Sequence, residues 1–192
     1  MKQVMVTFNG VSPLLMNPAT DDLLDQLFGG AGARKPKDPS MTMDKAAAGK
    51  VIRNEDGIIG IPALYLFSCL VEAGRQVKID SKRAISTKDS SLLPSFLTIE
   101  DFFLPFLDQN VEWKTDKRRG KLPKDGTAVC IVRPRFEKWS FGVTFTIDEN
   151  AVAMEKVRDL VDRAGNSVGL GDFRPACRGP FGRFKVVEWE VI

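Results

Sequence analysis

Residues 137–164, EKWSFGVTFTIDENAVAMEKVRDLVDRA, contain a strand pattern followed at once by a helix pattern. In the first part every second residue is apolar, as in a strand with one buried face; these residues are Trp139, Phe141, Val143, Phe145 and Ile147. In the second part the apolar residues recur at helical spacing; they are Val152, Met154, Val157, Leu160, Val161 and Ala164. We therefore predict a strand over 137–147 and a helix over 151–164, capped by Asp148, Glu149 and Asn150.

The rest of the chain contains the strands and the helix that we expect to pack with the strand and helix over 137–164. Apolar alternation predicts strands over 3–10 and 181–192, and a broad apolar face predicts a helix over 63–76, opened by Pro62. Residues 92–107 are apolar but contain Pro94 and Pro105, which favours an edge strand or a bent one. The order βαββαβ predicts an α+β, ferredoxin-like (RRM-like) core: a four-stranded antiparallel sheet with both helices on one face.

Two insertions interrupt this single predicted domain, which spans 1–192. The first, 17–50, holds a short predicted helix over 21–28, and its part 29–50 is rich in Gly, Ala, Lys and Pro with little to bury, so we expect it to be mobile. The second, 108–136, holds a predicted basic hairpin over 111–132.

The composition excludes several kinds of active site. With no histidine among 192 residues, Ser-His-Asp catalysis, Cys-His catalysis and His-ligated zinc are impossible. The cysteines form no CxxC pair; we interpret Cys69 and Cys130 as core thiols and Cys177 as a loop thiol. No apolar run approaches the ~18 residues of a membrane span. We expect a soluble, cytoplasmic protein without membrane contact, cofactor, metal or catalytic residue.

Positive charge is concentrated in three segments, although the net charge is only +3. Residues 113–138 contain nine basic and three acidic side chains, a local charge of +6. Residues 75–88 and 163–185 each contain five basic residues and one acidic residue, a local charge of +4. One basic run alone is typical of a solvated loop, but three of them favour a polyanionic partner.

The third segment includes residues 169–184, GLGDFRPACRGPFGRF, just before the last strand. Glycine lets backbone amides approach an anion, arginine offers a planar set of donors to phosphate, and phenylalanine offers a face on which bases stack. We therefore predict a nucleic-acid site; its loop residues are Gly169, Gly171, Phe173, Arg174, Arg178, Gly179, Phe181, Gly182 and Arg183. The hairpin adds Lys117, Arg118, Arg119 and Lys121. The alternative is a glycine-rich turn whose phenylalanines fill the core.

The chain resembles the RAMP superfamily, in particular the backbone subunits of CRISPR interference complexes. The resemblance rests on Ser12-Pro13-Leu14 after the first strand, Ile61-Pro62 before the first helix, and the glycine-rich loop over 169–183. After Ile-Pro the family has Gly-Ser-Ser-Leu-Lys-Gly, whereas this chain has Ala-Leu-Tyr-Leu-Phe-Ser at 63–68. The resemblance implies that the loop contacts a nucleic-acid backbone and that copies stack through a protruding thumb, here the basic hairpin.

The leading hypothesis is a non-catalytic protein that binds single-stranded RNA or DNA and forms a homo-oligomer along it. Its setting would be a CRISPR-type effector, or a phage system in which it coats single strands, with other CRISPR or phage proteins as further partners. One alternative is a metal-dependent ribonuclease on the same scaffold, for which Asp172 is the lone candidate acid near the loop. We expect that carboxylate instead to pair with Arg174 or Arg178, or to cap a turn. Another alternative is a phage structural or adaptor protein.

Overall fold

The computed structural model describes residues 1–19, 24–25, 28–29, 39–121 and 126–192. Its largest sheet is antiparallel, with strand order β4-β8-β1-β9. These strands are β1 (Lys2–Gly10), β4 (Leu97–Ile99), β8 (Ser140–Ile147) and β9 (Phe184–Val191). The strand predicted over 3–10 is confirmed, and the one predicted over 137–147 is confirmed from Ser140 onward. The last strand begins at Phe184 rather than at 181, because Phe181 and Gly182 belong to the preceding loop.

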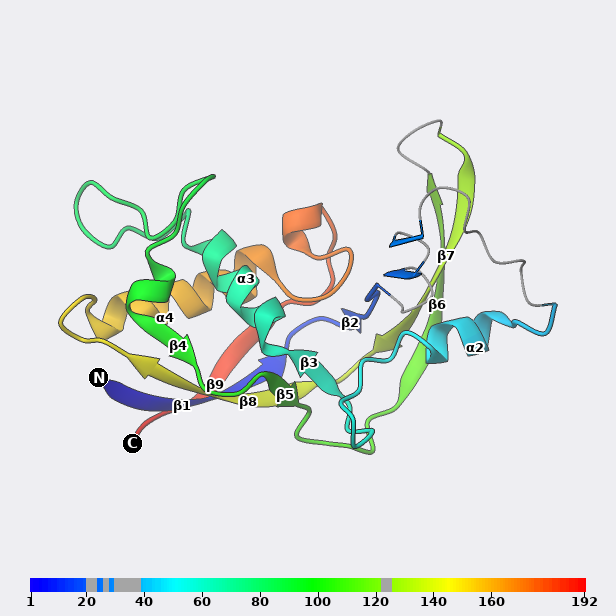
Figure 1. Cartoon of the computed structure of the whole chain (residues 1–192), viewed down its shortest axis with the longest axis horizontal. Helices are drawn as coiled ribbons and strands as arrows, with labels where there is room; N and C mark the ends of the chain where they lie inside the picture. The colour runs from blue at the N-terminus through cyan, green and yellow to red at the C-terminus, as the bar shows by residue number, and fades with distance from the viewer. Residues whose placement is uncertain (20–23, 26–27, 30–38, 122–125) are drawn as a thin grey trace.

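Two helices, α3 (Ala63–Ala73) and α4 (Met154–Arg163), lie over one face of this sheet (Figure 1). The side chains that the strands direct toward the helices are buried; Val4, Val6, Phe8, Phe141 and Phe145 have no exposed surface. The predicted helical residues of both segments supply the other half of this core. The fold is therefore mixed α/β, with antiparallel sheets and a few helices.

Both helices are shorter than the predicted ranges 63–76 and 151–164. Helix α4 begins at Met154, because the Asp148 carboxylate accepts the Asn150 N–H at 3.1 Å and so closes a turn instead of capping the helix. Helix α3 ends at Ala73, and Gly74 follows it as the C-cap. A π-helical turn (Ala164–Val168) continues α4 toward the glycine-rich loop.

The predicted apolar stretch 92–107 is bent, as its prolines indicate. It forms a 3₁₀ turn, η1 (Leu93–Ser95), then the edge strand β4, and then β5 (Phe103–Pro105). Strand β5 leaves the large sheet and pairs with β3 (Gly60–Pro62), directly before α3.

A second sheet stands at the end of the molecule opposite the two termini (Figure 1). It contains the basic hairpin, now seen as β6 (Trp113–Lys121) and β7 (Ala128–Phe136), with β2 (Leu14–Leu15) paired to β7. The predicted hairpin is confirmed, and β7 is longer than expected. Strand β2 was not predicted; it directly follows Pro13.

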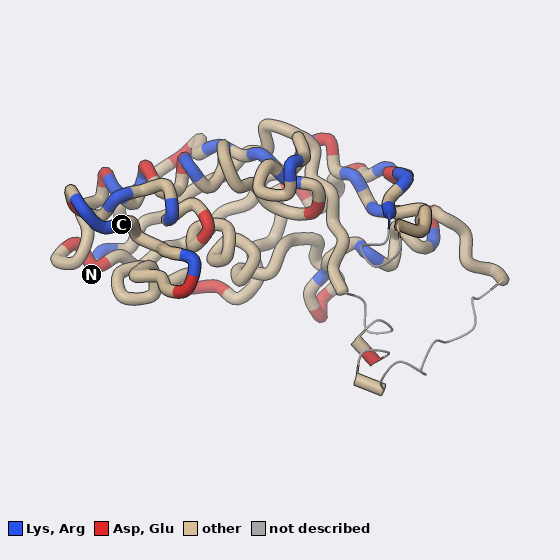
Figure 2. Tube along the Cα trace, turned by 90° about the horizontal axis from the view of Figure 1, so that it is seen from above, with Lys and Arg blue, Asp and Glu red and all other residues tan. Residues whose placement is uncertain are grey.

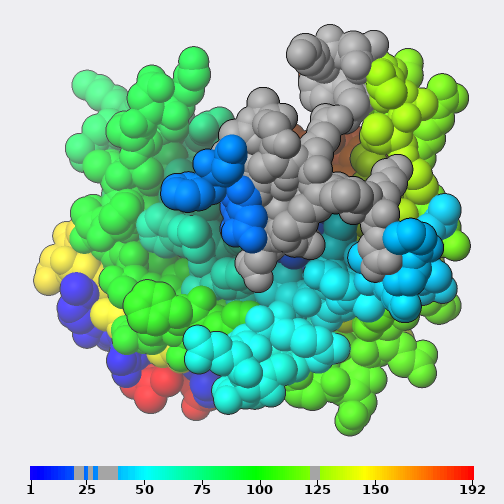
Figure 3. Space-filling view, turned by 45° about the vertical axis from the view of Figure 1, so that its right-hand side comes forward, coloured from blue at the N-terminus to red at the C-terminus, as the bar shows by residue number. Residues whose placement is uncertain are grey.

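Helix α2 (Met43–Ala48) packs against this hairpin, as Figure 3 shows for the light-blue and yellow-green segments. The Thr42 side chain caps the helix, Ala47 is buried, and the Thr115 hydroxyl donates to Asp44 at 2.6 Å. Of residues 39–50 only Ala47 is buried, in line with the expectation of little burial, but this part forms a helix that is not among the predicted elements. Residues 30–38 and most of the predicted helix over 21–28 lie outside the described residues.

No helix among the described residues is long and apolar enough to cross a membrane. The cysteines divide differently from the prediction: Cys69 is buried, whereas Cys130 and Cys177 are exposed. Cys130 was assigned to the core because apolar residues flank it, but it lies on the exposed face of β7.

Only two of the three thiols are therefore expected to react with a water-soluble disulfide reagent at mildly alkaline pH. Burial raises the pKa of the Cys69 thiol to about 12, so this group stays protonated and unreactive in the folded protein. A thiol titration before and after denaturation measures this difference. Three rapidly reacting thiols in the native protein would contradict the buried position of Cys69.

Candidate nucleic-acid interface

The glycine-rich loop is attached to the turn between β1 and β2. The Gly182 N–H donates to the Pro13 carbonyl at 2.8 Å, and the Asp172 N–H donates to the Leu15 carbonyl at 2.8 Å. The predicted turn at 12–14 and the predicted loop at 169–183 thus form one unit.

The glycines of the loop allow its backbone to approach residues 13–15, and its own carbonyl groups, closely. Gly171 and Gly182 have positive φ angles of 74° and 71°. A Cβ would lie 2.4 Å from the Leu15 carbonyl oxygen at Gly171, and 1.8 Å from the Leu170 carbonyl oxygen at Gly182. Three backbone amides of the loop are already hydrogen-bonded within the protein, because backbone carbonyls accept the N–H groups of Gly169, Gly179 and Gly182. These three amides are therefore not open to an anion, which corrects the expectation for them.

The two phenylalanines of the loop differ in exposure. Phe181 is 8% exposed, so its ring is not an open stacking face, which corrects the role predicted for it. Phe173 is 36% exposed and adopts a positive φ of 50°. The two rings lie 6.1 Å apart, and the Arg118 guanidinium of β6 lies over both, 4.6 Å from the Phe181 centroid and 5.9 Å from that of Phe173.

The four predicted hairpin residues lie on opposite faces of β6. Arg118 shares a face with Asp116, toward the loop, because residues two apart along a strand point the same way. Lys117, Arg119 and Lys121 are exposed on the other face. Figure 2 shows the Lys and Arg residues of the hairpin at the end of the molecule away from the termini. Of the four predicted hairpin cations, the structure thus brings Arg118 to the loop and leaves three apart from it.

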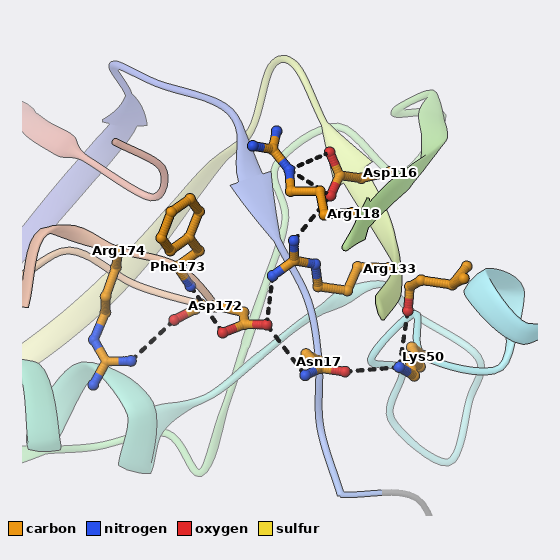
Figure 4. A network of polar contacts seen from close by, with 10 residues as sticks. Asn17, Lys50, Asp116, Arg118, Arg133, Asp172, Phe173 and Arg174 are labelled. Carbon is orange, nitrogen blue, oxygen red and sulfur yellow. Dashed lines mark hydrogen bonds and ion pairs between the residues drawn. The ribbon is translucent and has the colours of Figure 1, made fainter. Parts of the chain in front are cut away.

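A buried arginine beneath this junction joins the hairpin to the loop (Figure 4). The Arg133 side chain of β7 is 4% exposed and donates from Nη1 to Asp172 at 2.7 Å and from Nη2 to Asp116 at 3.0 Å. Asp116 is 5% exposed and also accepts from Arg118 Nε at 3.0 Å. Burial alone raises the pKa of Asp116, but the hydrogen bonds from Arg118 and Arg133 outweigh it and lower this pKa below its ordinary value.

Two further residues extend this network toward α2. Asn17 donates from Nδ2 to Asp172 at 3.1 Å, and Lys50 donates from Nζ to Asn17 Oδ1 and to the Val132 carbonyl, each at 2.8 Å. Burial, followed by the nearby charge of Arg133, lowers the pKa of Lys50. The prediction that Asp172 pairs with Arg174 or Arg178 is thus wrong, because its ion-pair partner is Arg133, which comes from another segment. The alternative, a carboxylate that bonds to its own loop, holds in part, since Asp172 Oδ1 accepts the Phe173 N–H at 2.8 Å.

Sequence reasoning counted Arg133 as one more basic residue of the hairpin and missed Asp116, Asn17 and Lys50. The hairpin register could have shown part of this network, since it pairs Asp116 with Arg133 directly across the two strands. Among the described residues, no group of three or more His, Cys, Asp and Glu side chains could hold a metal ion.

The three arginines of the loop remain at the surface or near it. Arg174 is half-buried and donates from Nη1 to the Gly171 carbonyl at 3.1 Å, which fixes its guanidinium beside the loop. Arg178 and Arg183 are exposed, and no ion pair of theirs exists within the described part of the chain. These side chains can bind an anion without breaking an existing ion pair.

The basic segment 75–88 carries partly neutralised charge. Arg83 pairs with Asp80 at 2.7 Å, and Arg75 pairs with Glu72 at 3.0 Å. Backbone N–H groups of Lys82 and Arg83, followed by the Arg83 side chain, lower the pKa of Asp80 to about 2. This segment is therefore a weaker candidate for anion binding than the junction of hairpin and loop.

Neither a protein-family model nor a curated protein matches the sequence of this chain. Among solved structures, its fold is similar to a chain in the cryo-EM structure of the Type III-B Cmr-beta bound to cognate target RNA. The TM-score is 0.51 and the sequence identity 12%. The match covers 100% of this chain and 60% of that chain, so the present chain spans about three-fifths of its length. At this identity the similarity concerns the fold.

Proposed function

We propose that this protein is a non-catalytic, RAMP-type protein with a ferredoxin-like core, which binds single-stranded RNA at the junction between the hairpin and the glycine-rich loop. The strand order β4-β8-β1-β9, with α3 and α4 on one face, supports the assignment of the core. The fold similarity to a chain in the Cmr-beta structure, which contains target RNA, supports a CRISPR-associated role and RNA as the polyanion.

One observation carries the proposal: the Arg118 guanidinium from the hairpin lies over the two phenylalanines of the loop. Cations and an exposed ring from distant segments thereby meet on one surface, which is the combination that single-stranded nucleic acid requires. Arg174, Arg178 and Arg183 bind phosphates, and Phe173 stacks on a base.

Copies of the protein assemble side by side along one strand. The exposed cations on the outer face of the hairpin, Lys117, Arg119 and Lys121, extend the basic surface beyond the loop. In this arrangement each copy covers a short stretch of the RNA, and the strand passes from one copy to the next.

The salt dependence of binding tests this proposal. We expect the affinity for a fluorescent single-stranded RNA to fall with salt at a slope of about −0.7 per phosphate contact, so that Arg174, Arg178 and Arg183 together give about −2.1. Fluorescence anisotropy over a series of salt concentrations measures the slope. Strands of increasing length, analysed by light scattering, report how many copies bind to each.

Two comparisons make the outcome decisive. The same titration with single-stranded DNA shows whether the protein distinguishes RNA from DNA. The absorbance ratio at 260 and 280 nm, with and without nuclease, shows whether the purified protein already carries nucleic acid. An affinity that hardly changes between low and high salt contradicts binding through phosphates.

A further inference from the structure

A cavity of about 300 Å³ opens between α3, the segment after β2, and the glycine-rich loop. Its walls are apolar where Met16, Ile52 and Ile61 line it, and polar where Asp172 and Arg174 line it. The volume lies at the lower end of the roughly 300–1,000 Å³ that small-ligand pockets occupy. We infer that this cavity binds a single unstacked nucleobase of the RNA strand, with Tyr65 as the stacking ring.

Tyr65 supplies the flat face that a base requires. It is the only tyrosine of the chain, it projects from α3 into the cavity lining, and it is 37% exposed. Within the described residues its hydroxyl has no hydrogen-bond partner, and neither does that of Ser68, which lines the same cavity one turn further along α3. Both hydroxyl groups are therefore free to bond to the polar edge of a base.

Arg174 connects the cavity to the phosphate-binding surface. Its side chain lines the cavity while Nη1 is held by the Gly171 carbonyl at 3.1 Å, so its other N–H groups are available to a phosphate. A nucleotide presents a flat ring, polar ring edges and a phosphate, and the cavity offers a complementary group for each. The buried Phe181 cannot provide a second open stacking face, which leaves Tyr65 and Phe173 as the aromatic contacts.

This inference rests on the proposed RNA binding, and its test separates base binding from phosphate binding. The probes are a single-stranded RNA and a strand of the same length whose sugars carry no bases, so that both have the same phosphates. We expect the wild type to prefer the base-bearing strand by about a hundredfold, the effect of one base stacked on Tyr65 and one on Phe173 at about tenfold each. Tyr65→Phe is expected to keep the stacking part of this preference, because it keeps the ring. Tyr65→Ala is expected to reduce this preference about tenfold, to the part that Phe173 supplies, and to keep the salt slope. Leu64→Ala is the matched control, because Leu64 is a more exposed neighbour on α3 that does not line the cavity.

A second measurement uses the wild type alone, so that it does not depend on the folding of a variant. Photo-crosslinking to a 5-bromouracil-containing RNA, followed by trypsin digestion and mass spectrometry, is expected to modify the peptide 54–75, which contains Tyr65. An undiminished preference in a folded Tyr65→Ala variant overturns the base site, as does a wild type that binds both strands equally. A wild type that binds neither strand contradicts the proposed function itself.

Discussion

An Arg133→Ala variant is expected to unfold with a free energy about 3–5 kcal/mol below that of the wild type, the usual effect of removing one partner from a buried ion pair. Arg133 lies between Asp116 and Asp172, and its side chain is 4% exposed. Without it, the buried Asp116 carboxylate keeps Arg118 as its one side-chain partner among the residues that the structure describes. Urea denaturation at neutral pH measures the loss.

Arg119→Ala is the matched control, because Arg119 lies on the outer face of the same hairpin and is exposed. We expect its effect to stay within about 0.5 kcal/mol. Arg133→Lys should be intermediate, since an ammonium group keeps the charge but cannot span both carboxylates as the guanidinium does. Equal stabilities of the alanine variants at positions 119 and 133 would show that the buried network contributes little.

The pH dependence gives this prediction a second readout. The pKa of Asp116 is lowered in the folded protein, so its stabilising contribution is present above the ordinary carboxyl value and is lost as the pH falls through the folded value. Removal of Arg133 takes away one of the hydrogen bonds that lower this pKa. The stability difference between the wild type and Arg133→Ala should therefore be largest near neutral pH and become smaller in acid.

A double variant, Arg174→Ala with Arg178→Ala, is expected to bind single-stranded RNA at least about a hundredfold more weakly than the wild type. Each charge-assisted contact to phosphate contributes roughly 1.5–3 kcal/mol, so that two contacts account for a loss of this size. The fold should survive: Arg178 keeps its left-handed backbone with alanine as it does with arginine, and Arg174 loses one hydrogen bond, to Gly171. Anisotropy for affinity and a melting curve, taken on one preparation, separate the two effects.

The matched control for this variant is Lys2→Ala with Arg53→Ala, which changes the net charge by the same amount. Lys2 lies in an exposed pair with Glu149 near the termini, and Arg53 is exposed and donates to the Gly57 carbonyl. Neither touches the loop, so the affinity should change by much less than in the loop variant. If the loop variant is folded and binds RNA within about threefold of the wild type, the loop is not the binding site.

Local sequence patterns were sufficient for the main elements of the fold. The alternation of apolar residues around Phe141 and Val143 predicts a strand with one buried face, and the apolar residues at helical spacing around Val157 and Leu160 predict an amphipathic helix. Each prediction is correct because side chains alternate along a strand and share one face every three to four residues along a helix. The order of these elements then limits the ways in which the sheet can be connected. The hairpin followed equally from local signals.

The tertiary structure alone decided which side chains are free to bind. The strand pattern shows that the side chains of Arg118 and Lys117 point to opposite faces of β6. Only the tertiary structure shows that the Arg118 side chain contacts Phe181 of the loop, whereas the Lys117 side chain lies on the exposed face. In the same way, Arg133 and Asp172 are 39 residues apart and become partners because the hairpin folds over the loop. Burial and ion pairing depend on contacts between distant segments, and no residue's immediate neighbours in the sequence encode them. For this reason the sequence could place positive charge and aromatic rings in one loop, while the fold determined that Arg133 and Phe181 are buried and that Arg174, Phe173 and Tyr65 remain partly exposed.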